Sequence, residues 1–170
     1  SGEGEFADFM DEMGIDWRWW SPPGLSPVAY LDSLGCLGPH VLVVHGVHLD
    51  EKGIERLAET DTPLCLCPRS NLHIGGELPD IPALLSAGMR LCLGTDSLAS
   101  CPDVDVLNEL PVLSEYFPEV PLETWLDLLT SSGADALGFS HLGAIAPGRR
   151  PGLLLLEDCV EPNQLRRSVE

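Results

Sequence analysis

The sequence predicts an α/β fold in which three buried parallel strands alternate with helices. Three short apolar runs recur along the chain, at Val41–His45, Pro63–Cys67 and Arg90–Gly94. Each run is continuous rather than alternating, as expected of parallel strands that are covered on both faces. A loop and a helical stretch follow each run, and this order is typical of parallel β/α units.

The length of the chain limits how far such units can close. A closed eight-stranded barrel needs about 250 residues, whereas the chain has 170. An open three-stranded sheet would fit this length, but its edges would expose unpaired backbone groups beside apolar side chains. The predicted sheet is therefore incomplete.

The N-terminal part predicts two helices joined by an aromatic loop. Glu5–Met13 has phenylalanine and methionine at helical spacing, and Ser26–Leu34 begins with a capping serine and a proline. The intervening loop, Asp16–Gly24, carries three tryptophans, of which Trp19 is the middle one. Aromatic side chains offer large rigid surfaces, so this loop can line a ligand pocket or clamp itself onto the barrel.

Further helices are expected after each strand. Asp50 is placed to cap the first of them, and Gly88 to close the second. The predicted helices are 51–59, 82–87, Val104–Tyr116 and Leu122–Leu137, the last two being separated by the turn Pro118–Pro121. The segment 143–157 ends in the apolar run Leu153–Leu156, which predicts a strand outside the sheet.

Charge and hydropathy exclude two classes of partner. Nine basic residues against 27 acidic ones give a net charge of −18, and such a surface repels nucleic acid. No apolar run approaches the roughly 18 residues that a membrane span requires. No signal peptide is visible. The expectation of a cytoplasmic protein rests on the cysteines, which indicate reduced thiols.

The six cysteines indicate reduced thiols rather than a disulfide scaffold. They are Cys36, Cys65, Cys67, Cys92, Cys101 and Cys159. Cys36, Cys65, Cys67 and Cys92 lie in or beside apolar stretches, where a free cysteine packs as a small hydrophobic residue. The pair formed by Cys65 and Cys67 lacks the second ligand pair of a typical zinc site, so packing is the preferred interpretation.

Two residues at predicted strand ends are candidates for chemistry. His45 ends the first strand, and Asp96 follows the third, where alternation places it on the face of Cys92 and Gly94. In barrel enzymes the reactive side chains lie at the carboxyl ends of strands. The structural alternatives are a core histidine bonded to a backbone carbonyl and an aspartate that caps a helix beginning at Ser97.

A predicted turn after the second strand is rich in polar groups. In Cys67–Asn71, Arg69 can hold a carboxylate or phosphate, while Ser70 and Asn71 can cap the following turn. On the residues alone this pattern is more often a structural turn. His48, His73 and Asp103 are expected in loops on the same face.

Three motifs together resemble a known family. His45–Leu49, Cys67–Asn71 and Leu93–Ser100, with their spacing, resemble the amidohydrolase superfamily, in its cytosine deaminase-like and chlorohydrolase-like branch. The residues of these motifs are most similar to those of aminodeoxyfutalosine deaminase-like proteins of menaquinone biosynthesis. Ala146–Gly152 resembles the family's return into a small β-sandwich.

The resemblance implies a fold and a reaction. It implies that residues 1–142 are the C-terminal portion, about strands 6–8, of a distorted (β/α)8 barrel, and that residues 143–170 begin the return to the sandwich. The family uses a divalent metal, zinc or alternatively iron, to activate water that deaminates an aminated purine-type substrate. Asp96 would then bind the metal and accept a proton, and His45 would contact the water or the developing oxyanion.

Substrate contacts are expected from the remaining polar and aromatic candidates. These are His48, Arg69, Ser70, Asn71 and Trp19. The family's other metal-binding histidines and its proton-shuttling glutamate have no counterpart in the chain, so we expect activity to need the N-terminal half of the barrel, or a homo-oligomer. The alternative is a non-catalytic binding module derived from an amidohydrolase.

Overall fold

The computed structural model describes residues 2–154. The chain forms two compact units, Ser1–Cys36 and Leu37–Glu170. The first unit contains helices α1 (Glu5–Glu12) and α2 (Pro27–Ser33), as predicted. Ser26 caps α2, since its Oγ accepts a hydrogen bond from the Ala29 amide at 3.3 Å. No helix of the described residues is long and apolar enough to cross a membrane.

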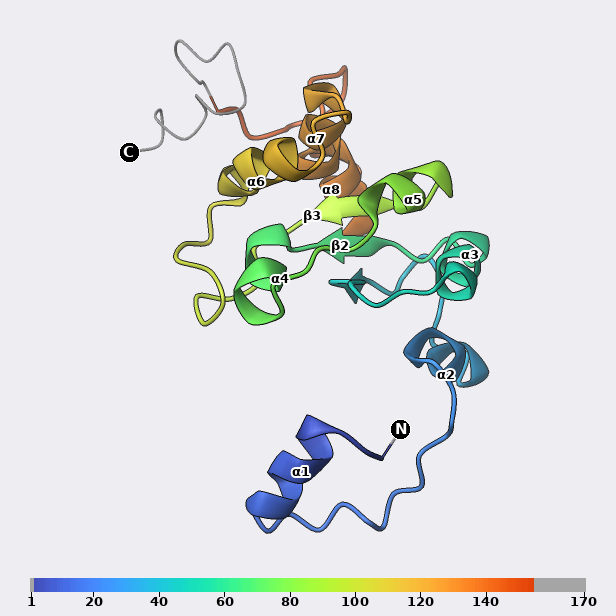
Figure 1. Ribbon diagram of the computed structural model, residues 1–170. Helices are drawn as coiled ribbons and strands as arrows, with labels where there is room; N and C mark the ends of the chain where they lie inside the picture. The colour runs from blue at the N-terminus through green and yellow to red at the C-terminus, as the bar shows by residue number, and fades with distance from the viewer. Residues whose placement is uncertain (1, 155–170) are drawn as a thin grey trace. The chain divides into compact units, whose positions relative to one another are not determined.

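The second unit contains the predicted sheet (Figure 1). Strands β1 (Val43–Val44), β2 (Leu64–Leu66) and β3 (Leu91–Leu93) are parallel and lie in the order β1-β2-β3. The three predicted strands are therefore confirmed, although each is shorter than its apolar run. Burial of β1 on both faces was a wrong expectation, because within residues 2–154 β1 is an edge strand and Val44 is 42% exposed.

Local capping signals place the helices that follow β1 and β2. Helix α3 (Glu51–Glu59) has the predicted bounds, and Asp50 Oδ1 accepts a hydrogen bond from the Gly53 amide at 2.8 Å. Helix α5 (Ile81–Ser86) begins one residue before the predicted start, because Asp80 caps it through the Ala83 amide at 3.0 Å.

The polar segment after β2 is a helix rather than the predicted turn. Helix α4 (Pro68–Ile74) begins directly after Cys67. Proline is favoured at the first helical position because its missing N–H would have no partner there. The capping tendency of Ser70 and Asn71 does not prevent the helix, because tertiary hydrogen bonds occupy both side chains.

Two long predicted helices are each divided. The stretch Val104–Tyr116 contains the 3-10 helix η1 (Val106–Asn108) and then α6 (Glu109–Tyr116), which puts Pro111 in the first turn of α6 where it breaks no helical hydrogen bond.

The predicted helix 122–137 is α7 (Leu122–Leu129) followed by α8 (Ser131–Ala136). Thr130 between them has φ −114° and ψ −86°, and its hydroxyl donates to the Leu126 carbonyl at 2.6 Å. Such back-bonding of a threonine hydroxyl to the preceding turn bends helices.

The hydrophobic core lies between the sheet and the helices of the second unit. Its fully buried side chains include Leu57 of α3, Leu64 and Leu66 of β2, Leu110 of α6 and Trp125 of α7. Figure 1 shows α7 and α8 beside β3, and both helices contact that strand. The core thus holds the three strands in place and leaves their carboxyl ends at one edge of the sheet.

The predicted return strand is not formed in the described residues. Residues 151–154 have no regular structure, and Leu153 and Leu154 are 77% and 68% exposed. Leu155 and Leu156 lie outside the described residues.

Cys36 is exposed, so the expectation that it packs as a hydrophobic residue was wrong.

Candidate active site

The carboxyl edge of the sheet carries both predicted catalytic residues. His45 directly follows β1, and Asp96 lies three residues after β3. Both have a positive φ, 73° for His45 and 63° for Asp96. A left-handed conformation at a residue other than glycine costs about 1–3 kcal/mol, and such residues cluster at functional sites. The positive φ also takes Asp96 out of the extended geometry on which the predicted face-sharing with Cys92 depended.

The first turn of α4 connects three parts of the second unit. Three consecutive residues each bind a different element: Arg69 binds Glu109 at the start of α6, Ser70 binds Asp96 after β3, and Asn71 binds His45 after β1. A helix turns about 100° per residue, so successive side chains point in different directions. The segment that was predicted as a turn is therefore the centre of the site.

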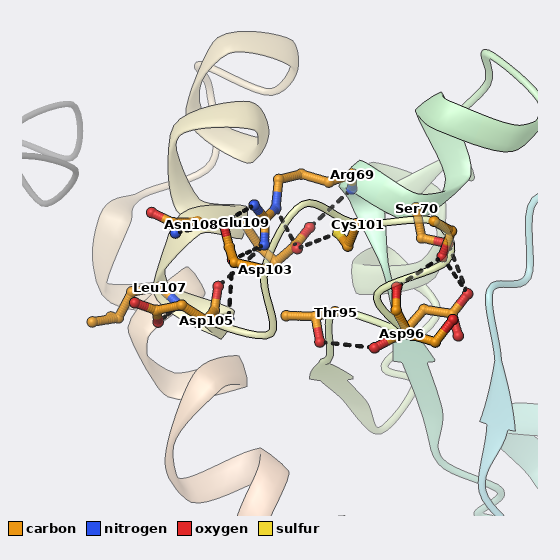
Figure 2. A network of polar contacts seen from close by, with 12 residues as sticks. Arg69, Ser70, Thr95, Asp96, Cys101, Asp103, Asp105, Leu107, Asn108 and Glu109 are labelled. Atoms are coloured by element: carbon orange, nitrogen blue, oxygen red, sulfur yellow. Dashed lines mark hydrogen bonds and ion pairs between the residues drawn. The ribbon is translucent and has the colours of Figure 1, made fainter. Parts of the chain in front are cut away.

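Two serine hydroxyls hold Asp96. Ser70 Oγ donates to Asp96 Oδ2 at 2.8 Å (Figure 2). Ser100 Oγ lies 3.0 Å from the same oxygen and 2.9 Å from Ser70 Oγ. The hydrogen bond from Ser70, followed by that from Ser100, lowers the pKa of Asp96 below its ordinary value. Asp96 is therefore a carboxylate at neutral pH, the form that can bind a cation. It does not cap a helix, because residues 98–100 form a turn and the next described helix begins at Val106.

An amide side chain orients His45. Its Nδ1 lies 2.8 Å from Asn71 Oδ1, and because an amide oxygen only accepts hydrogen bonds, Nδ1 is the donor in this pair. Nε2 is then the ring nitrogen left for another partner. The alternative of a core histidine bonded to a backbone carbonyl is therefore wrong. Asn71 is 6% exposed, and its Nδ2 has no hydrogen-bond partner among the described residues.

A buried ion pair fixes α4 to α6. Arg69 Nε donates to Glu109 Oε1 at 2.7 Å, and its backbone amide donates to Glu109 Oε2 at 2.9 Å. The two terminal nitrogens of Arg69 donate to Asp103 at 3.1 and 2.8 Å (Figure 2). The Glu109 side chain is fully buried, and that of Arg69 is 12% exposed. Arg69 thus holds carboxylates of its own chain. The substrate contacts expected of Arg69, Ser70 and Asn71 stay predictions.

This network predicts a dependence of stability on pH. The hydrogen bonds from Arg69 hold the pKa of Asp103 well below its ordinary value. A depressed folded-state pKa adds stability above the unfolded-state value of about 3.9, and this stability is lost as the pH falls further. We expect the urea concentration at the unfolding midpoint to decrease as the pH is lowered below about 4. In Asp103→Asn this decrease should be less steep. Equal slopes in the two proteins would contradict the role given to Asp103.

The other sequence candidates are not brought into this network. His48 is exposed, and no hydrogen bond joins it to the site within residues 2–154. Trp19 is 80% exposed and belongs to the first unit. His73 lies in α4 rather than in a loop and is also exposed. Substrate contacts by His48 and Trp19 remain predictions.

Two residues of the site were missed in the sequence. Nothing in the local pattern distinguishes Ser100. Glu109 did carry a signal, because it lies four residues before the buried Leu113 and therefore occupies a core position of an otherwise apolar helix face. A carboxylate at such a position requires a cationic partner.

The described residues do not hold a metal ion by themselves. Among residues 2–154 no group of three or more His, Cys, Asp or Glu is arranged to bind one. A catalytic zinc needs about three protein ligands, and Asp96 supplies one.

The comparisons with known proteins place the chain in a family. The model of the amidohydrolase family matches residues 24–167. The chain belongs to the amidohydrolase family. As an amidohydrolase chain it is 33% identical over 142 residues to the 5-methylthioadenosine/S-adenosylhomocysteine deaminase of Syntrophobacter fumaroxidans, a match that covers 79% of the chain and 32% of the relative. It is 34% identical over 140 residues to the 8-oxoguanine deaminase of Pseudomonas aeruginosa, covering 79% and 31%. This amidohydrolase chain thus spans about a third of the length of these curated relatives.

Solved amidohydrolase structures share the fold. An adenosine deaminase from Xanthomonas campestris with bound zinc superimposes with a TM-score of 0.69 at 30% identity, covering 84% of this chain and 32% of the other. A triazine hydrolase from Arthobacter aurescens gives a TM-score of 0.68 at 25% identity, covering 75% and 30%.

Proposed function

We propose that the chain is the C-terminal portion of a metal-dependent deaminase barrel, about strands 6–8, acting on an aminated purine-type substrate. The observation that carries the proposal is the Asp96–Ser70 hydrogen bond beside the Asn71–His45 pair, at the carboxyl edge of a parallel sheet. Barrel enzymes place catalytic groups at that edge. Relatives named as deaminases of methylthioadenosine, 8-oxoguanine and 5'-deoxyadenosine support the substrate class.

In this proposal the chain supplies a carboxylate and an imidazole. Asp96, ionised and held by two serine hydroxyls, is one metal ligand and takes a proton from the attacking water. His45, with its Nδ1 proton directed to Asn71, offers Nε2 toward the water or the developing oxyanion. A bound divalent metal, zinc foremost and iron as the alternative, makes water nucleophilic at neutral pH.

The remaining metal ligands would come from the preceding strands of the barrel. The position of β1 as the outermost strand supports this requirement. In the described chain β1 has a strand neighbour on one side only, and Val44 is 42% exposed. An edge strand presents unpaired backbone groups to which another strand can pair. The N-terminal half of the barrel is the proposed partner, and a second copy of the chain is the alternative.

The test is to restore a barrel-length protein and to assay it. Residues 24–167 would replace the matching C-terminal segment of the Xanthomonas campestris deaminase, and ammonia release would be measured with adenosine, methylthioadenosine and aminodeoxyfutalosine. We expect metal binding and turnover of at least one of these substrates, and neither in the 170-residue chain alone. A soluble, metal-loaded chimaera without turnover of any of them would contradict the proposal and favour a binding module.

A further inference from the structure

Three cysteines gather on one face of the sheet. Cys65 of β2 and Cys92 of β3 are direct partners in the strand register. Cys67 lies two residues after Cys65, and residues two apart on a strand point to the same face. A Cβ atom added at Gly94 would lie 2.8 Å from Cys65 Sγ and 3.6 Å from Cys67 Sγ. The sulfurs of Cys65 and Cys67 therefore lie at the position that the missing side chain of Gly94 leaves open, and the strand register places Cys92 directly beside Cys65.

The thiols in this group are not equivalent. Cys92 is 3% exposed, and Cys65 is half-buried. The hydrogen bond from the Cys65 thiol lowers the pKa of Cys92. For Cys65, a hydrogen bond with Cys67 acts to lower the pKa, but the hydrogen bond to Cys92 and burial together raise it to about 12. Cys92 is thus the sulfur that ionises first, and Cys65 keeps its proton beside it.

Strand geometry selects which pair can join. Registered residues on adjacent strands lie about 4.8 Å apart, within the usual Cα separation of about 4.4–6.8 Å in disulfides. Residues two apart on one strand lie about 6.6 Å apart, near the upper limit of that range. The cross-strand pair of Cys65 and Cys92 is therefore favoured over Cys65 and Cys67.

We propose that Cys65 and Cys92 form a reversible disulfide when the chain meets hydrogen peroxide, a small neutral oxidant that can reach a buried thiol. The Cys92 thiolate attacks one peroxide oxygen and the O–O bond breaks, which gives a sulfenic acid and hydroxide. The proton that Cys92 lost on ionisation converts the hydroxide to water. The Cys65 sulfur then attacks the Cys92 sulfur, and the sulfenic oxygen leaves as a second water. Two thiols and one peroxide give one disulfide and two waters.

The location of the bond gives it a structural effect. Cys65 Sγ lies 2.8 Å from the point where a Cβ atom at position 94 would stand, and Gly94 lies two residues before Asp96. A bond between adjacent parallel strands draws the two Cβ atoms closer than the sheet spacing, and such strain makes a disulfide easier to reduce. The proposed oxidation is therefore reversible by a dithiol, and it acts on the strand that leads to the candidate site.

The experiment uses the full chain with Cys36→Ser and Cys159→Ser, so that these two thiols do not react. After peroxide treatment and alkylation, trypsin cleaves at Arg56, Arg69, Arg90 and Arg149, which puts Cys65 and Cys67 in one peptide and Cys92 and Cys101 in another. We expect these two peptides to be cross-linked with loss of two hydrogens, and dithiothreitol to separate them. Oxygen addition without a cross-link, a bond within the first peptide, or no reaction would each overturn the proposal.

Single variants then identify the two sulfurs. Cys65→Ala and Cys92→Ala should each abolish the cross-link completely, whereas the matched controls Cys67→Ala and Cys101→Ala should retain it. A cross-link that survives in Cys65→Ala or Cys92→Ala would overturn the assignment. Alkylation of the parent protein before and after oxidation gives a check that needs no core variant, since protection must appear at Cys65 and Cys92 together.

Discussion

Asp96→Asn is expected to abolish turnover in the barrel-length chimaera. The substitution keeps the shape of the side chain but removes the negative charge that the Ser70 and Ser100 hydroxyls stabilise. An amide can neither take a proton from water nor bind a cation as a carboxylate does. Loss of a general base alone costs roughly 10²–10⁴-fold in rate. Ammonia release and metal content, measured on the same sample, should both fall.

The chain offers a matched control for that substitution. Asp61 also has a positive φ, 53°, but it lies before β2 at the opposite edge of the sheet and pairs with Arg90. Asp61→Asn should leave turnover and metal content close to those of the parent. If Asp96→Asn retained parental activity, Asp96 would have no part in the mechanism. If Asp61→Asn lost activity equally, the effect would be one of folding.

Arg69→Ala is expected to lower the free energy of unfolding of the chain by about 3–5 kcal/mol, because it leaves a buried carboxylate without its cation. Glu109 is fully buried, and Arg69 supplies both a side-chain and a backbone hydrogen bond to it. Urea denaturation followed by circular dichroism measures the change. Against a typical total of about 5–15 kcal/mol, this loss brings the chain close to unfolding.

Arg90→Ala is the control for Arg69→Ala. Arg90 also pairs with two carboxylates, Asp61 at 3.1 Å and Asp135 at 2.7 Å, but both partners are exposed. Exposed ion pairs contribute about 0–1 kcal/mol, so Arg90→Ala should change the unfolding free energy little. The double variant Arg69→Met with Glu109→Leu should recover much of the loss, because it removes both buried charges together. Equal effects of Arg69→Ala and Arg90→Ala would contradict the importance of burial.

The sequence predicts those parts of the fold that short-range signals determine. The strands follow from their apolar runs, and α3 follows from the capping position of Asp50. The division of the helix at Thr130 was missed, because it depends on the backbone conformation of one residue within an otherwise helical pattern. Helix α4 was missed because Ser70 and Asn71 favour turns locally, and their tertiary partners are distant in the sequence.

In the candidate site, too, the residues marked by a local signal could be predicted and their distant partners could not. His45 and Asp96 were chosen as candidates because polar groups at the ends of apolar strands require an explanation. Their hydrogen-bond partners could not be predicted, because Ser70 binds Asp96 across 26 positions and Arg69 binds Glu109 across 40. Such pairings become visible only when the strand order is known. Cys65 and Cys92 are a further case, since only the strand register brings them together.

The arrangement around α4 makes the site sensitive to helix rotation. Arg69, Ser70 and Asn71 depend on one another for orientation, since a single turn of one short helix carries all three contacts. Inserting or deleting one residue between Cys67 and Arg69 would turn the helix by about 100° and misdirect all three at once. Sequence drift elsewhere on the exposed face of α4 is free of this constraint. The site therefore depends on the rotation of α4 about its axis as well as on the identity of its residues. That rotation is set by the start of the helix at Pro68.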